Sequence, residues 1–156
     1  PPESVAGYRV QPSQTFAVEA CDALYRDLSL PPAAYWAACF ALLQPGRKMA
    51  QIITESEAYT RQIAARPGRY DKTRASIALR GCGLGEDAPT LPSREPGAAD
   101  QEVTDGWVFV LETSLTFDLG FRMLTASWGG VVQIRHDGPV RLGYRPVGLQ
   151  TTPGFS

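Results

Sequence analysis

The sequence contains one histidine, three cysteines and no long hydrophobic run. A catalytic scheme that needs an imidazole must therefore use His136, which we expect to pack on the apolar face of a terminal hairpin. Cys21, Cys39 and Cys82 form no Cys-x-x-Cys pair, so a zinc site with His136 would need four scattered ligands to converge. We expect buried free thiols, or one disulfide with one free thiol, and neither a metal nor a cofactor.

The chain also lacks a strong net charge. It has 15 basic and 16 acidic side chains, for a formal charge of -1. This balance excludes a polybasic nucleic-acid binder and an acidic disordered tail, so nucleic acid is not an expected partner. The longest nearly apolar run, 33–43, is about half of the roughly 20 residues that a membrane span needs. We interpret it as a buried helix and expect no transmembrane segment.

The first residues are Pro1, Pro2 and Glu3, with no initiator methionine. Removal of a targeting peptide would explain this start and would favour an intracellular, organellar location such as the mitochondrion. Excision of the methionine or a truncation explains it equally well. The 156 residues are enough for a single domain, 1–156, with an apolar core that needs no disulfides.

The N-terminal half predicts helices. Residues 1–14 form an extended arm, with strand character over 8–10, and helices occupy 15–66. Pro31 and Pro32 are expected to end a first helix and begin a second, which runs to Gln44, and a third helix follows from Met49. The first helix is predicted from apolar residues at four-residue steps with a capping hydroxyl before them: Phe16, Ala20, Leu24 and Leu28, after Ser13 or Thr15.

The C-terminal half predicts strands. A short strand is expected over 75–79, and residues 82–106 form a long acidic loop rich in proline and glycine. The β-rich part covers 107–147, with separate runs at 107–111, 115–119, 121–128, 131–136 and 140–145, and a tail follows at 148–156. The fold class is α+β: an N-terminal helical layer of about three helices packed on a C-terminal antiparallel sheet ending in a hairpin. An open sheet and a partly closed barrel both fit this pattern.

Charge is segregated along the chain. Residues 61–80 contain six basic side chains and one acidic side chain, whereas residues 86–105 contain six acidic side chains and one basic side chain. The two blocks either pair with each other, or each faces a partner of opposite charge.

The terminal hairpin predicts an anion-binding face. Matching apolar residues across the two strands favours a three-residue loop, 137–139, with His136 opposite Val140. The other face then carries Arg135 opposite Arg141, with Arg145 one pair further on. Like charges in this position either point into solvent or need an anion between them. The candidates are the acidic loop of the same chain, another subunit, a lipid head group or a phosphate.

Two other motifs carry little chemistry. Glu55 and Glu57 point about 200° apart on a helix, so they form a weak acid–base pair. The glycines at 81, 83 and 85 lack the spacing and the ending of a nucleotide-binding loop.

These observations favour a non-catalytic interaction or accessory subunit of a larger multi-protein assembly. Its arm, loop and tail would contact other protein subunits, and Phe155 would be the exposed aromatic residue of the tail. One alternative is a small enzyme or ligand-binding domain with a pocket near His136 and the Arg135 and Arg141 face. Another is a chaperone or toxin-neutralising binding protein.

Overall fold

The computed structural model describes residues 3–5, 8–10, 14–18, 20–65, 71–83, 97, 100–143, 147 and 149–152. Two helices, α1 (Ala23–Leu42) and α2 (Met49–Ala65), precede a sheet of four strands: β4 (Ala75–Gly83), β5 (Val108–Asp118), β6 (Met123–Arg135) and β7 (Gly138–Leu142). A short 3-10 turn, Lys72–Arg74, leads into β4. The remaining strands are β1 (Glu3–Val5), β2 (Tyr8–Val10), β3 (Phe16–Val18) and β8 (Gln150–Thr152).

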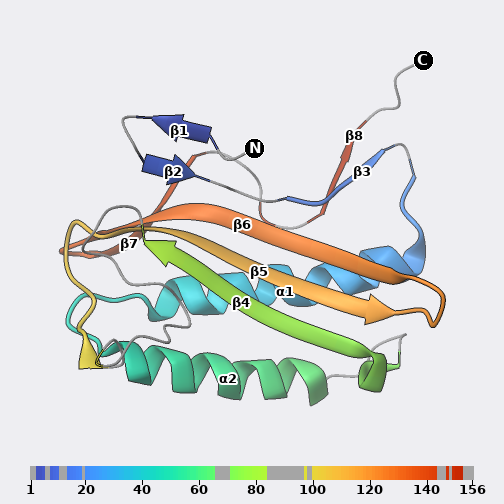
Figure 1. Ribbon diagram of the computed structural model, residues 1–156, viewed down its shortest axis with the longest axis horizontal. Helices are drawn as coiled ribbons and strands as arrows, with labels where there is room; N and C mark the ends of the chain where they lie inside the picture. Colours follow the sequence, from blue (N-terminus) through green and yellow to red (C-terminus); the bar gives the residue numbers. More distant parts are fainter. Residues whose placement is uncertain are drawn as a thin grey trace.

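The architecture is α+β, with both helices on one side of an antiparallel sheet of order β4-β5-β6-β7 (Figure 1). The helical layer has two helices where the sequence predicted about three. The predicted strand at residues 8–10 is present as β2, which pairs with β1. No helix in the described part of the chain is long and apolar enough to cross a membrane.

Helix α1 contains both prolines that were expected to separate two helices. Asp22 begins the helix by accepting a hydrogen bond from the backbone N–H of Leu24 at 2.7 Å. Each proline removes one backbone donor from the helix, which normally breaks it. Here Pro32 is buried, and Thr113 of β5 donates a hydrogen bond to its carbonyl at 2.7 Å. Packing on the sheet therefore holds together a helix that its local sequence would interrupt.

The predicted helix around residues 15–28 is wrong over its first half. Phe16–Val18 is the strand β3, which pairs in parallel with β8, more than 130 residues away. The neighbouring Thr15 also bonds to β6, because its backbone N–H donates to Ser127 at 3.2 Å. The local spacing of apolar residues cannot reveal a pairing with a strand so far away in the sequence. Cys21 and Cys39 are both free thiols, as predicted, but only Cys39 is buried, because Cys21 lies before α1 and is half-buried.

Glycine also failed to interrupt the strands. Residues 82 and 83, predicted to begin the long loop, are instead the end of β4, in which Gly81 lies opposite Leu111. The predicted runs 107–111 and 115–119 form one strand, β5. Gly129 and Gly130 lie inside β6, and a Cβ built on Gly130 would stand 3.2 Å from Cζ2 of Trp36. The missing side chain at Gly130 is therefore the space into which the indole packs.

The terminal hairpin has a different register from the predicted one. Its loop is the pair His136 and Asp137, and Arg135 lies opposite Gly138. Gly138 has φ +128°, a backbone conformation that L side chains rarely adopt, so the glycine itself sets the turn. Arg141 consequently pairs with Val132. The predicted pair of facing arginines does not exist, and His136 is exposed in the turn.

The core lies between α1 and the middle of the sheet. Trp36 donates a hydrogen bond from Nε1 to the carbonyl of Leu111 at 2.9 Å and packs edge-on against Trp128, with ring centroids 6.1 Å apart. The indole ring also stacks on the ring of Phe40, with centroids 5.2 Å apart. Half of the predicted arm and most of the predicted acidic loop and tail lie outside the described residues. From the loop, Val103 is buried in the core beside the α1–α2 connection.

Candidate functional site

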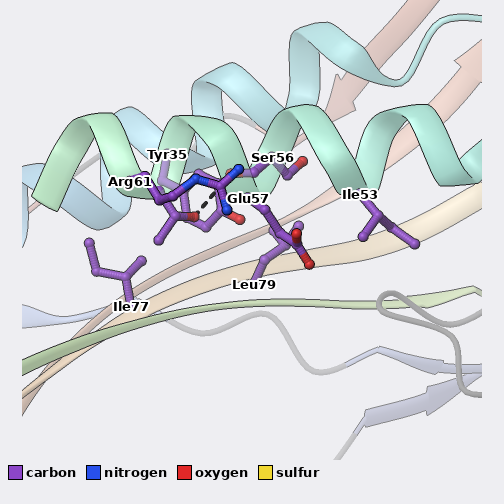
Figure 2. Close-up of a pocket in the computed structure, with 8 residues that line it drawn as sticks. Tyr35, Ile53, Ser56, Glu57, Arg61, Ile77 and Leu79 are labelled. Atoms are coloured by element: carbon purple, nitrogen blue, oxygen red, sulfur yellow. Dashed lines mark hydrogen bonds between the residues drawn. The ribbon is translucent and has the colours of Figure 1, made fainter.

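A pocket of about 360 Å³ lies between α2 and the edge strand β4 (Figure 2). Ile77 and Leu79 of β4 form one wall. Helix α2 forms the opposite wall, and the side chain of Tyr35 of α1 also lines the pocket. The α2 residues that line the pocket are Ile53, Ser56, Glu57, Thr60 and Arg61.

The pocket exists because the two helices cover the sheet unequally. Helix α1 packs across β5 and β6, whereas α2 packs mainly on α1 and makes little contact with the sheet. Two apolar side chains of β4, Ile77 and Leu79, therefore face the helices but are only half-buried, because α2 does not cover them completely. Apolar side chains beside an open volume of this size are typical of ligand sites.

A buried polar cluster lies behind the apolar walls. Sγ of Cys39 donates a hydrogen bond to Oγ of Ser56 at 3.5 Å, and Thr60 donates from its hydroxyl to the Ser56 carbonyl at 3.0 Å. The ring of Tyr35 stacks with that of Tyr59 at a centroid distance of 6.0 Å. These contacts fix the helix-side wall, so the pocket is bounded by hydrogen-bonded side chains.

Burial raises the pKa values of two groups of this cluster, both of which are protonated at neutral pH even without the shift. Desolvation raises the pKa of Tyr35 to about 12, although its hydrogen bond with Thr60 opposes the shift. Desolvation likewise raises the pKa of the Cys39 thiol to about 11, against hydrogen bonds with Ser56 and Tyr35. Neither group is therefore prepared to act as a nucleophile or a base near pH 7.

We expect these pKa values to make the protein less stable in alkali. A raised pKa means that the folded state keeps its proton when the unfolded chain has lost it, so stability is constant at lower pH and falls as the pH rises. The fall spans pH 9 to about 11 for Cys39 and pH 10 to about 12 for Tyr35. Together the two groups should cost about 3 to 4 kcal/mol in the free energy of unfolding between about pH 8 and pH 11, and Cys39 should account for more than half of that loss.

Urea unfolding at these two pH values measures this loss directly. The variant Cys39→Ala, which lacks the buried thiol, should show a smaller loss than the original protein. An equal loss in both proteins would mean that the thiol does not titrate in this way.

Two exposed charged side chains stand at the mouth of the pocket. Glu57 and Arg61 are one helical turn apart on α2, yet no ion pair forms between them in the described structure. Glu55, two residues before Glu57, instead pairs with Arg47. The mouth therefore offers one negative and one positive group to a ligand.

The structure separates the predicted site residues. Arg135 is exposed at the end of β6, while Arg141 is half-buried on the side of the sheet that faces the helices. Arg145 and Phe155 lie outside the described residues. Among the residues that are described, no three His, Cys, Asp or Glu side chains come close enough to hold a metal ion.

Sequence reasoning missed the α2–β4 pocket, although one signal pointed to it. Ser56 and Thr60 are one turn apart on a helix face that also carries Ile52 and Ile53. Small hydroxyl residues on an otherwise apolar helix face need hydrogen-bond partners when they are buried. The size of the pocket depends on the distance between α2 and β4, which no local pattern records.

Comparison with known proteins relates the fold to part of several peptidases. No protein-family model and no curated protein sequence matches this chain. Among solved structures, it is similar to a dipeptidase from Pyrococcus horikoshii OT3, with TM-score 0.70 and 14% identity over 93% of this chain and 38% of that one. An X-Pro aminopeptidase from Thermotoga maritima matches with TM-score 0.70 and 11% identity over 93% and 38%.

A third similar structure carries a different kind of name. The N-terminal domain of the FACT complex subunit SPT16 from Cicer arietinum (chickpea) matches with TM-score 0.53 and 16% identity, over 78% of this chain and 29% of that one. The chain thus spans less than two fifths of the length of each of these three proteins. At such low identity the likeness establishes the fold: two helices on an antiparallel sheet, arranged as in part of these proteins.

Proposed function

We propose that this domain binds an extended polypeptide segment without cleaving it, and that an apolar side chain of that segment enters the α2–β4 pocket. The observation that carries the proposal is the pocket itself, which lies beside β4, the terminal strand of the described four-stranded sheet. The structural likeness to a dipeptidase and an X-Pro aminopeptidase supports a peptide as the ligand. The likeness to a domain of a FACT complex subunit supports an interaction role.

The walls of the pocket suit an apolar side chain. Ile53, Ile77 and Leu79 present hydrocarbon from both sides of a volume of about 360 Å³, which lies at the lower end of the range for small-ligand pockets, about 300–1,000 Å³. Burying one Leu- or Phe-sized side chain there would contribute about 1.5 to 3 kcal/mol to binding. That contribution corresponds to about ten- to a hundredfold in affinity.

The edge of β4 suits the backbone of an extended segment. Strand β4 is at one end of the described four-stranded sheet and pairs there only with β5. An added strand would form main-chain hydrogen bonds along this edge, and every second side chain would face the helices. Ile77 and Leu79 already face that way, so a residue beside them would enter the pocket.

The charges at the mouth suit polar groups that flank the apolar side chain. Glu57 and Arg61 stand on the helix above the pocket and are both exposed. A segment with a basic group near Glu57 or an acidic group near Arg61 would gain a surface ion pair, worth about 0.2 to 1 kcal/mol. These groups would select among segments, while the apolar contact would supply most of the affinity.

A binding role is favoured over cleavage by the state of the nearby acidic groups. The pKa values of Tyr35 and Cys39 are raised to about 12 and about 11, so both stay neutral at physiological pH. A nucleophile would need a lowered pKa or an adjacent base. Membership of a larger assembly through the arm, loop and tail, and an organellar location, remain predictions from the sequence.

The proposal is tested by fluorescence anisotropy with short labelled peptides that differ at one central position, Gly, Ala, Leu, Phe or Pro. We expect affinity to rise by about tenfold or more from Gly to the best apolar residue. Leu79→Trp, which fills the pocket from β4, should abolish this preference. Arg61→Gln should weaken peptides with an acidic flank by a few fold, whereas the matched control Arg135→Gln, at the other end of the sheet, should not.

Two outcomes would overturn the proposal. Equal affinity for the Gly and apolar peptides would show that the pocket takes no side chain, provided circular dichroism confirms that the variants are folded. Cleavage products of the bound peptides, detected by mass spectrometry, would replace a binding role by a catalytic one.

A further inference from the structure

Two exposed arginines flank the α2–β4 pocket on opposite faces of the sheet. Figure 2 shows Arg61 of α2 at the same end of the pocket as Ile77. Arg80 follows Leu79 in β4, and its side chain lies on the face away from the helices, because successive side chains of a strand point to opposite faces. Both arginines belong to the block of residues 61–80, in which six basic side chains accompany one acidic side chain.

Two acidic side chains lie near these arginines without pairing with them. Glu112 of β5 is directly opposite Arg80 in the strand register, and Glu57 is one turn before Arg61 on α2. In the described part of the chain, neither arginine forms an ion pair with a carboxylate. Each guanidinium group can therefore donate two parallel hydrogen bonds to a carboxylate of a bound segment.

The register of an added strand determines which of its residues would reach each arginine. The apolar anchor is the residue that lies opposite Leu79 and enters the pocket. If the segment runs antiparallel to β4, the residue before the anchor lies opposite Arg80 and points to the same face as that arginine. The residue two positions after the anchor lies opposite Ile77, on the helix side, where Arg61 stands. Two acidic residues with this spacing would each meet one arginine.

We propose that the segment bound at the α2–β4 pocket is acidic and pairs antiparallel with β4, with the order acidic, apolar, any residue, acidic. This inference rests on the proposed peptide-binding function and names the class of peptide. The four described strands of the sheet all pair antiparallel, and antiparallel pairing is slightly more stable per residue than parallel pairing. An opposite charge directly across a strand pair increases affinity by about twofold to fivefold.

Four labelled peptides of equal length test the proposal by fluorescence anisotropy. Their central residues are Asp-Leu-Thr-Asp, the neutral form Asn-Leu-Thr-Asn, the anchorless form Asn-Gly-Thr-Asn and the reversed order Asp-Thr-Leu-Asp. We expect Asp-Leu-Thr-Asp to bind about fourfold to twentyfold more tightly than its neutral form. In about 1 M sodium chloride most of this advantage should disappear, because the Debye length falls to about 3 Å. The reversed order has the same net charge and should bind more weakly than Asp-Leu-Thr-Asp.

Variants of the two arginines show which aspartate each one contacts. With peptides that carry a single aspartate, Arg80→Gln should remove the advantage of Asp-Leu-Thr-Asn only. Arg61→Gln should remove the advantage of Asn-Leu-Thr-Asp only. The matched control Arg135→Gln removes the same charge from the exposed end of β6 and should leave all affinities unchanged.

The peptides separate failure of this inference from failure of the proposed function. Equal affinity for the acidic and neutral Leu peptides would show that the segment is not selected by charge. Tighter binding of the reversed order would overturn the antiparallel pairing. Both results would leave the peptide-binding proposal in place if the neutral Leu peptide still binds more tightly than the Gly peptide. Equal affinity for those two neutral peptides would instead contradict the proposed function itself.

Discussion

Replacing Trp36 by alanine is expected to lower the free energy of unfolding by about 3 to 5 kcal/mol, the range found when large buried aromatic residues are truncated. Trp36 is buried, stacks on Phe40 and packs edge-on against Trp128. Its loss would leave a cavity between α1 and the sheet. The buried carbonyl of Leu111 would also lose its hydrogen bond.

Urea unfolding of Trp36→Ala and Trp36→Phe separates these two contributions. Phenylalanine keeps an aromatic ring but cannot donate to Leu111, so this variant should lose less, about 1 to 3 kcal/mol. If Trp36→Ala costs less than about 1 kcal/mol, α1 does not pack on β5 and β6 as described.

Replacing Gly130 by valine is expected to cost about 3 kcal/mol, the upper part of the range for overpacking a core. The first added carbon alone would stand 3.2 Å from Cζ2 of Trp36, and the two branches of valine would extend further into the indole. Neither group can move easily, because Gly130 is in the middle of β6 and Trp36 is fixed by its hydrogen bond.

A double-mutant cycle provides the control. If the clash with the indole causes the loss, Gly130→Val should cost at least about 1 kcal/mol less in a Trp36→Phe background, where the smaller ring leaves space. An identical cost in both backgrounds would place the strain elsewhere in β6. The cycle is measured from urea midpoints of the four proteins.

The same contacts explain why two boundaries predicted from the sequence were wrong. Pro31 and Pro32 looked like a helix boundary and the Gly129–Gly130 pair like a strand boundary, because proline and glycine usually interrupt regular structure. Both pairs lie inside continuous elements that pack around Trp36 and Trp128. Tertiary packing therefore overrode two local signals, and the helix count and strand lengths changed with them.

Elements with a clear local pattern were predicted well. The apolar spacing after Met49 predicts α2, and the alternation at 115–119 predicts part of β5. Pairings between distant segments were not predictable in this way. The β3–β8 pair joins segments that are far apart in the sequence, and the hairpin register depends on the backbone conformation of Gly138. Matching apolar residues between neighbouring strands predicts neither of them.

The candidate site was the least predictable part. Its polar residues Ser56 and Thr60 show a helical spacing, but the pocket volume arises from the separation of α2 and β4. Of the arginines singled out from the sequence, Arg141 does line a cavity, although through a different register from the predicted one. The charge pattern singled out Arg141, but the strand pairing places it opposite Val132 and not opposite Arg135.

The most direct test of the peptide-binding proposal is a map of backbone amide shifts in the ¹⁵N-labelled chain during titration with the tightest apolar peptide. We predict that the largest shifts fall on Ser56, Thr60, Ile77 and Leu79, on both sides of the pocket. The Gly peptide at the same concentration should cause much smaller changes. Shifts confined to β6 and β7, or no shifts at a saturating peptide concentration, would contradict the assignment of this pocket as the binding site.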